Sequence, residues 1–244
     1  MGGRGGSYSR SADIAVSAVG ADGTNIDLSS SPLHYGGPDP NLTGEARTTI
    51  EDFEGRRWKN KIEFSRFIDA DGNIVEDNRG GKGSVKASLN ARLTADIMSH
   101  NHPRSGSEAG LLGGTFSTAD LNNFAQYNQT TYRATAAEGT YSISKLEGFD
   151  KSGFSQYVKS ENSKNHAAYE STMTTLNSSY QAGNLKYSDY ASAAHKAFNT
   201  YLVAEHNSWR AGQKLYGYHY TLERRSNNGR KDKNTEAHQR QHRR

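Results

Sequence analysis

Two histidines and one aspartate carry the clearest chemical signal in this sequence. His100 and His102 stand two residues apart, and Asp120 follows in the segment Ser117-Thr-Ala-Asp120. Side chains two apart in a strand point to the same face of a sheet, so both imidazoles can converge on one ion. Two imidazoles and one carboxylate supply three ligands and leave a fourth position for water, as in catalytic zinc sites. The chain contains no cysteine, so any metal must be bound by histidine and carboxylate.

The elements around these residues have to bring them together. Residues 95–99 predict a short strand that leads into the histidine pair, and Pro103 ends it because proline cannot continue a strand ladder. We therefore expect the pair to lie at an edge of the sheet that opens to solvent. Ser117 and Asp120 have the spacing of a capping box, which predicts a helix that begins directly after Ser117. A carboxylate in that first helical turn is restrained and points outward from the helix end.

Each half of this pattern also has a simpler interpretation. Two histidines at this spacing occur by chance, and Ser-x-x-Asp is by itself an ordinary capping box. The capping role and the ligand role are compatible, so accepting one does not remove the other. The two halves taken together favour a metal site.

The order His-x-His-Pro, a glycine-containing spacer and Ser-x-x-Asp resembles the JAMM signature of the JAB/MPN metalloprotease family. The residues that match the signature are His100, His102, Pro103, Ser117 and Asp120. The resemblance implies a Zn²⁺ ion bound by the two histidines and the aspartate. It also implies an α+β fold with a mixed, cytidine-deaminase-like β-sheet flanked by helices, here with a C-terminal helical extension. One departure is the spacer 104–116, which is longer than the family's usual loop and predicts a loop that bulges beside the site.

The family also has an upstream glutamate that acts as general acid and base. Four glutamates lie in the corresponding window, namely Glu51, Glu54, Glu63 and Glu76. We favour Glu63, because Glu-x5-Asp-x-Asp-Gly is similar to bacterial and phage-type members and a strand end can reach a metal on a neighbouring strand. Glu54 and Glu76 remain the alternatives.

The function that this resemblance implies is zinc-dependent hydrolysis of a peptide or isopeptide bond. The metal lowers the pKa of its water towards about 7, and Glu63 takes the proton and delivers it to the leaving amine. Ser117 donates a hydrogen bond to the oxyanion of the tetrahedral intermediate. The alternative is a non-catalytic JAB-type scaffold that binds nucleic acid or a protein partner through its basic tail and helices. A zinc deaminase is disfavoured, because its Pro-Cys-x-x-Cys ligands require cysteine.

Composition divides the 244 residues into four segments. We expect a flexible, glycine- and serine-rich segment over 1–41, a metal-binding domain over 42–148, two helices and a final strand over 149–223, and a disordered basic tail over 224–244. The tail holds eight Lys and Arg against two acidic residues, whereas the net charge of the whole chain is +4. Such a basic tail is weak evidence for contact with nucleic acid.

Apolar periodicity predicts the elements within these segments. We expect three helices: a short one that begins near Thr49, and two longer ones over 154–180 and 187–209. The expected strands are the hairpin 61–75, a short strand at 84–88, and strands at 140–144 and 215–222. The chain shows no run of 18 apolar residues and no hydrophobic signal segment at its start, so we expect a soluble, cytoplasmic protein with a peptide or protein substrate. Its opening MGGRGGS is similar to small basic proteins of phages and prophages, which places it in a bacterium or a phage-infected host cell.

Overall fold

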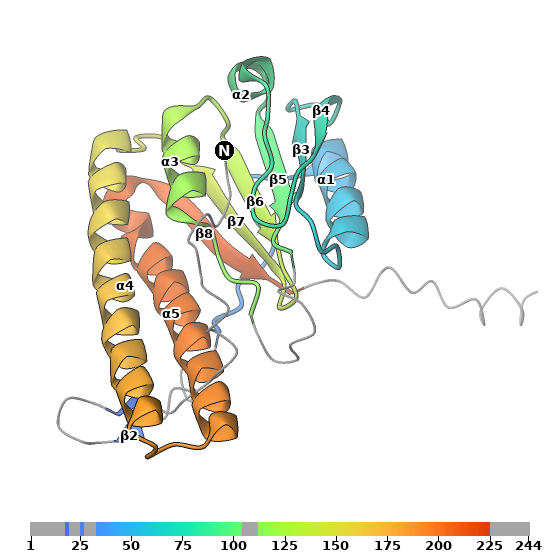
Figure 1. Ribbon diagram of the computed structural model, residues 1–244. Helices are drawn as coiled ribbons and strands as arrows, with labels where there is room; N and C mark the ends of the chain where they lie inside the picture. Colours follow the sequence, from blue (N-terminus) through green and yellow to red (C-terminus); the bar gives the residue numbers. More distant parts are fainter. Residues whose placement is uncertain (1–17, 20–24, 27–32, 104–111, 225–244) are drawn as a thin grey trace, which may run out of the picture.

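The computed structural model describes residues 18–19, 25–26, 33–103 and 112–224 of the chain (Figure 1). The strands are β1 (Ala18–Val19), β2 (Asn25–Ile26), β3 (Phe64–Ile68), β4 (Ile74–Arg79), β5 (Ile97–Asn101), β6 (Thr131–Thr135), β7 (Thr140–Lys145) and β8 (Tyr218–Glu223). The helices are α1 (Gly44–Arg57), α2 (Leu89–Thr94), α3 (Thr118–Gln126), α4 (Lys151–Gln181) and α5 (Tyr187–Tyr216). No helix in these ranges is both long and apolar enough to cross a membrane.

Six of the strands form one mixed sheet in the order β4-β3-β5-β6-β7-β8. The pair β5–β6 is parallel and the other pairs are antiparallel. A parallel pair needs a crossover connection, and α3 supplies it between β5 and β6. The predicted combination of a mixed sheet with flanking helices is therefore confirmed.

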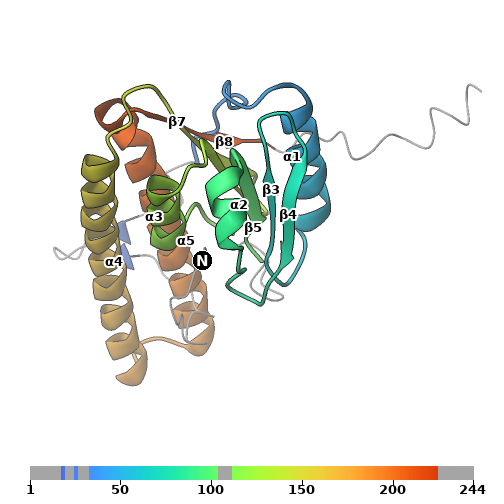
Figure 2. The ribbon, with the colours of Figure 1, turned by 90° about the horizontal axis from the view of Figure 1, so that it is seen from above.

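The two faces of this sheet are covered by different helices. Figure 2 shows α1 on one side and α2, α3 and α4 on the other. The face opposite α1 holds the main apolar core. There, Phe67, Met98 and Tyr132 of the sheet pack with Phe124 of α3 and Trp209 of α5. Burial of large apolar and aromatic side chains such as these stabilises the fold.

The α1 face of the sheet carries a buried ionic network. Arg133 on β6 donates to both carboxylate oxygens of Glu54 on α1, at 2.7 and 3.0 Å. It also donates to both oxygens of Glu223 on β8, at 2.8 and 3.1 Å. A buried guanidinium requires such compensation, because removing a charge from water without a partner is costly. The network joins α1 to the last strand of the sheet.

Asp39, in the segment before α1, belongs to this packed layer. The carboxylate of Asp39 accepts hydrogen bonds from the hydroxyls of Ser142 and Ser144 on β7, at 2.7 and 2.6 Å. The Asp39 N–H donates to Glu223 at 2.7 Å. The segment that composition assigned to a flexible start therefore contains residues that are part of the folded domain.

The C-terminal helices form a long antiparallel hairpin that extends beyond the sheet in Figure 1. α4 and α5 have 31 and 30 residues and are joined through Gly183, which has a φ of +76°. α5 is capped by Gly217, which has a φ of +68°, and the chain then enters β8 directly. The predicted strand at 215–222 is therefore shortened to Tyr218–Glu223, and β8 pairs with β7 in the same sheet.

Several predicted elements differ from the structure. The strand expected over 84–88 is absent apart from an isolated bridge at Val85, and α2 follows it unpredicted. α1 begins at Gly44 rather than near Thr49. The sequence pattern does not predict β6, because Arg133 interrupts its apolar residues. Arg133 can lie in the core only because buried carboxylates such as that of Glu54 pair with its guanidinium. The basic tail beyond 224, residues 104–111 of the spacer and most of the first 32 residues lie outside the described residues.

Candidate metal centre

The two histidines lie at the carboxyl end of β5, inside the sheet. β5 is paired with β3 on one side and with β6 on the other, with Ser65 opposite His100. His102 follows the strand, and its backbone N–H donates to the carbonyl of Thr135 at 2.9 Å. The expectation of a solvent-open sheet edge is therefore wrong. β5 ends at Asn101, it is paired on both sides, and both imidazoles are buried.

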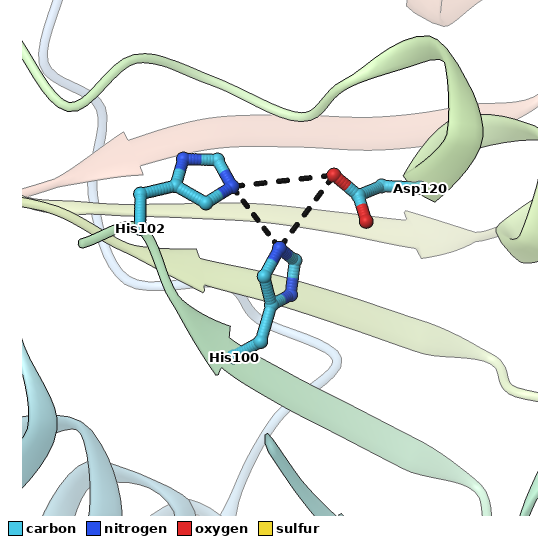
Figure 3. Close-up of side chains that lie close together, drawn as sticks. All are labelled: His100, His102 and Asp120. Atoms are coloured by element: carbon cyan, nitrogen blue, oxygen red, sulfur yellow. Dashed lines mark hydrogen bonds and ion pairs between the residues drawn. The ribbon is translucent and has the colours of Figure 1, made fainter. Parts of the chain in front are cut away.

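Asp120 reaches the histidines from the first turn of α3. Ser117 is the N-cap, and its hydroxyl accepts from the Asp120 N–H at 3.1 Å. In return, Asp120 Oδ2 accepts from the backbone N–H of Ser117 at 2.8 Å and from its hydroxyl at 2.7 Å. This reciprocal capping box is the predicted one. It fixes the aspartate so that its carboxylate points at the two imidazoles (Figure 3).

The three side chains converge within the distances that a metal ion requires. His100 Nε2 lies 3.0 Å from His102 Nε2 and 3.5 Å from Asp120 Oδ2, and His102 Nε2 lies 4.0 Å from the same oxygen. Ligands at about 2.0–2.1 Å from a tetrahedral zinc are separated by about 3.3 Å, which these distances bracket. This is the one group of three such side chains within the described ranges that could hold a metal ion.

The hydrogen bonds of the site leave acceptor atoms for a cation. His102 Nδ1 lies 2.8 Å from the carbonyl of Gly114. A carbonyl oxygen can only accept, so Nδ1 carries the proton and the neutral ring has its lone pair on Nε2. Asp120 Oδ1 and Glu63 Oε2 are buried with no hydrogen-bond partner among the residues that the structure describes. Orphaned buried carboxylate oxygens are rare in proteins, and a cation with its water would give them partners.

The electrostatics of the cluster also favour positive charge. Burial lowers the pKa of His100, but the charge of Asp120 and a hydrogen bond to it outweigh that effect, so the net shift is upward. Burial raises the pKa of Asp120, but His100 and His102 lower it more, so this carboxyl stays ionised well below its usual range. An anionic carboxylate beside two imidazoles in a buried site is the charge pattern of a cation-binding centre.

Glu63 is the upstream glutamate that lies beside the cluster. It directly precedes β3, and its backbone is held by hydrogen bonds with Gly80 and Gly81 at 2.8 and 2.7 Å. Its side chain is 2% exposed, and Oε1 lies 3.9 Å from His100 Nε2. Burial raises the pKa of Glu63 to about 7, with the charge of His100 opposing this shift and that of Asp120 adding to it.

The other three glutamates of the window have different partners. Glu51 is paired with Arg47 on the exposed side of α1. Glu54 faces the opposite side of the sheet, where it binds Arg133. Glu76, on the edge strand β4, accepts from the side chain of Asn78 at 2.7 Å and from the backbone of Ser88 at 2.9 Å.

Sequence reasoning missed the residues that orient His102. The Gly114 carbonyl accepts the imidazole proton, and the two N–H groups of Gly113 and Gly114 are bound by Glu138. The glycine pair Gly113–Gly114, shortly before the capping box, was a signal in the sequence, because glycines permit the backbone to approach another group closely. The sequence around Glu138 does not indicate this role, because the two glycines that it binds lie 24 and 25 residues earlier in the chain.

Comparisons with protein-family models, curated proteins and solved structures found no match for this chain. The functional inference therefore depends on the geometry of the site and on the signature in the sequence.

Proposed function

We propose that this chain is a zinc-dependent metallopeptidase of the JAB/MPN type, which hydrolyses a peptide or isopeptide bond. The observation that carries the proposal is the convergence of the Nε2 atoms of His100 and His102 with Asp120 Oδ2, all within 4.0 Å of one another. The convergence joins a strand end to the start of the helix that follows it, as the sequence signature requires.

His100, His102 and Asp120 are the residues that would hold the metal. A zinc ion supplies Lewis acidity when bound, and it makes a nucleophile available from water near neutral pH. The protein contributes two imidazole lone pairs and one carboxylate oxygen. All three side chains are buried, and burial strengthens the charge interactions between them.

Glu63 is the residue that we assign to proton transfer. Its carboxylate lies beside His100 but is not one of the three converging ligands. An acceptor in that position takes the proton of the attacking water and returns it to the leaving amine. The backbone bonds to Gly80 and Gly81 hold the start of β3, so this side chain is supported by a strand ladder and not by a loose loop.

Ser117 is the residue that we assign to the oxyanion. Its hydroxyl donates to Asp120 Oδ2 in this structure, so it must turn away from the carboxylate in order to donate to substrate. The backbone N–H of Ser117 holds the same oxygen at 2.8 Å and would keep Asp120 in place during that turn. A donor that is directed at the developing oxyanion stabilises the transition state more than the substrate.

The test of this function is metal-dependent cleavage. Linear peptide libraries and lysine-linked isopeptide libraries would be incubated with the zinc-loaded protein, and new amino termini would be identified by mass spectrometry. We expect cleavage that a chelator abolishes and zinc restores, and that Glu63→Gln lacks. A zinc-loaded protein that cleaves neither library, but binds DNA or RNA in a salt-sensitive manner, would favour the non-catalytic scaffold instead.

A further inference from the structure

We propose that Glu138 is a positioning residue of the metal centre, which acts through the backbone of Gly113 and Gly114 to fix the tautomer and orientation of His102. The inference rests on the proposed function in one respect only, namely that His102 is a metal ligand. It does not depend on which bond is cleaved, or on whether any bond is cleaved.

Both oxygens of the Glu138 carboxylate are used to hold the two glycines. The N–H of Gly113 donates to Oε2 at 2.9 Å, and the N–H of Gly114 donates to Oε1 at 2.7 Å. The hydroxyl of Tyr141 donates to Oε1 as well, at 2.8 Å. Hydrogen bonds to an ionised acceptor are short and about twice as strong as neutral ones. The carboxylate therefore holds two successive peptide groups in one orientation.

The Gly114 carbonyl belongs to the next peptide group along the chain, between Gly114 and Thr115, and it faces His102. The carbonyl oxygen lies 2.8 Å from Nδ1 and can only accept, so it selects the tautomer that is protonated on Nδ1. In this tautomer, the lone pair is on Nε2, the atom that lies 3.0 Å from His100 Nε2 and 4.0 Å from Asp120 Oδ2. The partner of the second ring nitrogen is what fixes a metal-binding histidine.

The segment has the residues that such close packing requires. A β-carbon at Gly113 would lie 2.6 Å from the β-carbon of Ala136, so a larger residue would displace the segment from the β6–β7 turn. Gly114 has a φ of +80°, a conformation that favours glycine. On the far side, the hydroxyl of Thr115 is hydrogen-bonded to that of Tyr220 at 2.7 Å. The carbonyl that faces His102 is therefore held from both directions.

Glu138 lies at the end of the β6–β7 hairpin, where the N–H of Ala136 donates to the carbonyl of Gly139 at 2.8 Å. His100 lies near the end of the neighbouring strand β5 and His102 follows that strand, which is parallel to β6. The carboxyl ends of two parallel strands lie at the same end of the sheet. The register of the sheet, and not the local sequence, therefore brings Glu138 to the metal centre.

The test compares Glu138→Gln and Glu138→Asp with Glu147→Gln, a matched control at an exposed glutamate after β7. Gln keeps the length of the side chain but presents one N–H₂ group to a glycine N–H. Asp keeps the charge but is too short to hold both glycines. Outer-shell substitutions typically weaken metal affinity by 10–100-fold, and we expect about tenfold weaker zinc binding in both Glu138 variants. The control should bind zinc as the wild type does.

A second measurement separates positioning from general stabilisation. Long-range ¹H–¹⁵N spectra of the metal-free protein, labelled at histidine nitrogen, report the tautomer of His102 directly. We expect protonation on Nδ1 in the wild type and the control, and a mixture of tautomers in both Glu138 variants. Wild-type protonation on Nε2 would overturn the inference even if neither variant folded. A folded variant that keeps wild-type zinc affinity and a single Nδ1–H tautomer would overturn it as well.

These measurements also separate this inference from the proposed function. A protein that binds zinc and shows the expected tautomers, but cleaves no peptide or isopeptide, leaves the positioning role intact and refutes the hydrolase. A protein that cleaves both before and after Glu138→Gln with unchanged zinc affinity refutes the positioning role and leaves the hydrolase intact.

Discussion

The Nε2 atoms of His100 and His102 face each other at 3.0 Å. Two lone pairs at this distance repel, so a proton or a cation must lie between the rings. The bond from His102 Nδ1 to Gly114 leaves His102 Nε2 as an acceptor, and Asp120 adds a negative charge on the third side. The space between the rings can hold either the proton of a His100 N–H group or a metal ion, and the predictions below test for the metal ion.

Zinc should stabilise the fold by mass action. At free zinc about 100 times its dissociation constant, binding adds about 2.7 kcal/mol to the free energy of unfolding. For a chain of this size, that corresponds to a rise in Tm of roughly 5–10 °C. Differential scanning calorimetry with zinc and with a chelator measures it. The double variant His100→Ala with His102→Ala should show no zinc-dependent shift and should retain no zinc after purification.

Glu63→Gln should separate metal binding from hydrolysis. The variant removes the proton acceptor but none of the three converging ligands, so the zinc content should stay at about one equivalent. General acid–base catalysis is typically worth 10²–10⁴-fold, and we expect a loss of turnover in that range. Glu76→Gln on the edge strand is the matched control and should retain activity. Full turnover in Glu63→Gln would refute this assignment of the base.

Ser117→Ala should reduce both stability and turnover, whereas Ser88→Ala should reduce stability alone. Both serines cap a helix, since the hydroxyl of Ser88 accepts from the Ala91 N–H at 3.0 Å. Loss of such a cap typically costs about 1 kcal/mol. Only Ser117 lies beside the cluster, and removal of an oxyanion donor typically lowers kcat by about 10²–10³-fold. Urea unfolding and steady-state kinetics on both variants measure the two effects, and equal turnover would contradict the oxyanion role.

Breaking the buried ion pair on the opposite face should cost much more than breaking an exposed one. Glu54→Gln removes the charge that Arg133 contacts through two hydrogen bonds, and loss of one partner of a buried pair typically costs about 3–5 kcal/mol. Glu51→Gln removes an exposed partner of Arg47 on the same helix, which should cost less than about 1 kcal/mol. Urea unfolding of metal-free protein gives both free energies. Similar values for the two variants would show that the network contributes little.

Glu223 should make the stability depend on pH in the acidic range. Burial raises its pKa, but hydrogen bonds from Arg133 and the charge of that residue lower it more, so the folded pKa lies below the ordinary value of 4.5. A lowered folded pKa stabilises the protein fully above the unfolded pKa, and this contribution is lost as the pH falls through the folded pKa. We expect the free energy of unfolding of metal-free protein to decrease as the pH falls below about 4.5, the unfolded pKa. Glu223→Gln should reduce that decrease, and an unchanged pH profile would contradict it.

Local rules of the sequence account for the parts of the site that depend on neighbouring residues. The spacing of His100 and His102 puts both on one face of a strand, because side chains alternate with a period of two. The spacing of Ser117 and Asp120 is that of a capping box, which the structure contains. The long apolar stripes of α4 and α5 likewise follow from helical periodicity.

Tertiary structure decided which distant residues meet. Four glutamates precede the histidines at suitable distances, and only the register of β3 against β5 brings Glu63 beside His100 while Glu54 faces the opposite layer. The parallel pairing of β5 with β6 makes β5 an inner strand, whereas local reasoning placed the imidazoles at an open edge. The same pairing carries Glu138 to the glycines that orient His102. Such contacts depend on sheet order and register, which are set by burial of the whole core and not by any short stretch of sequence.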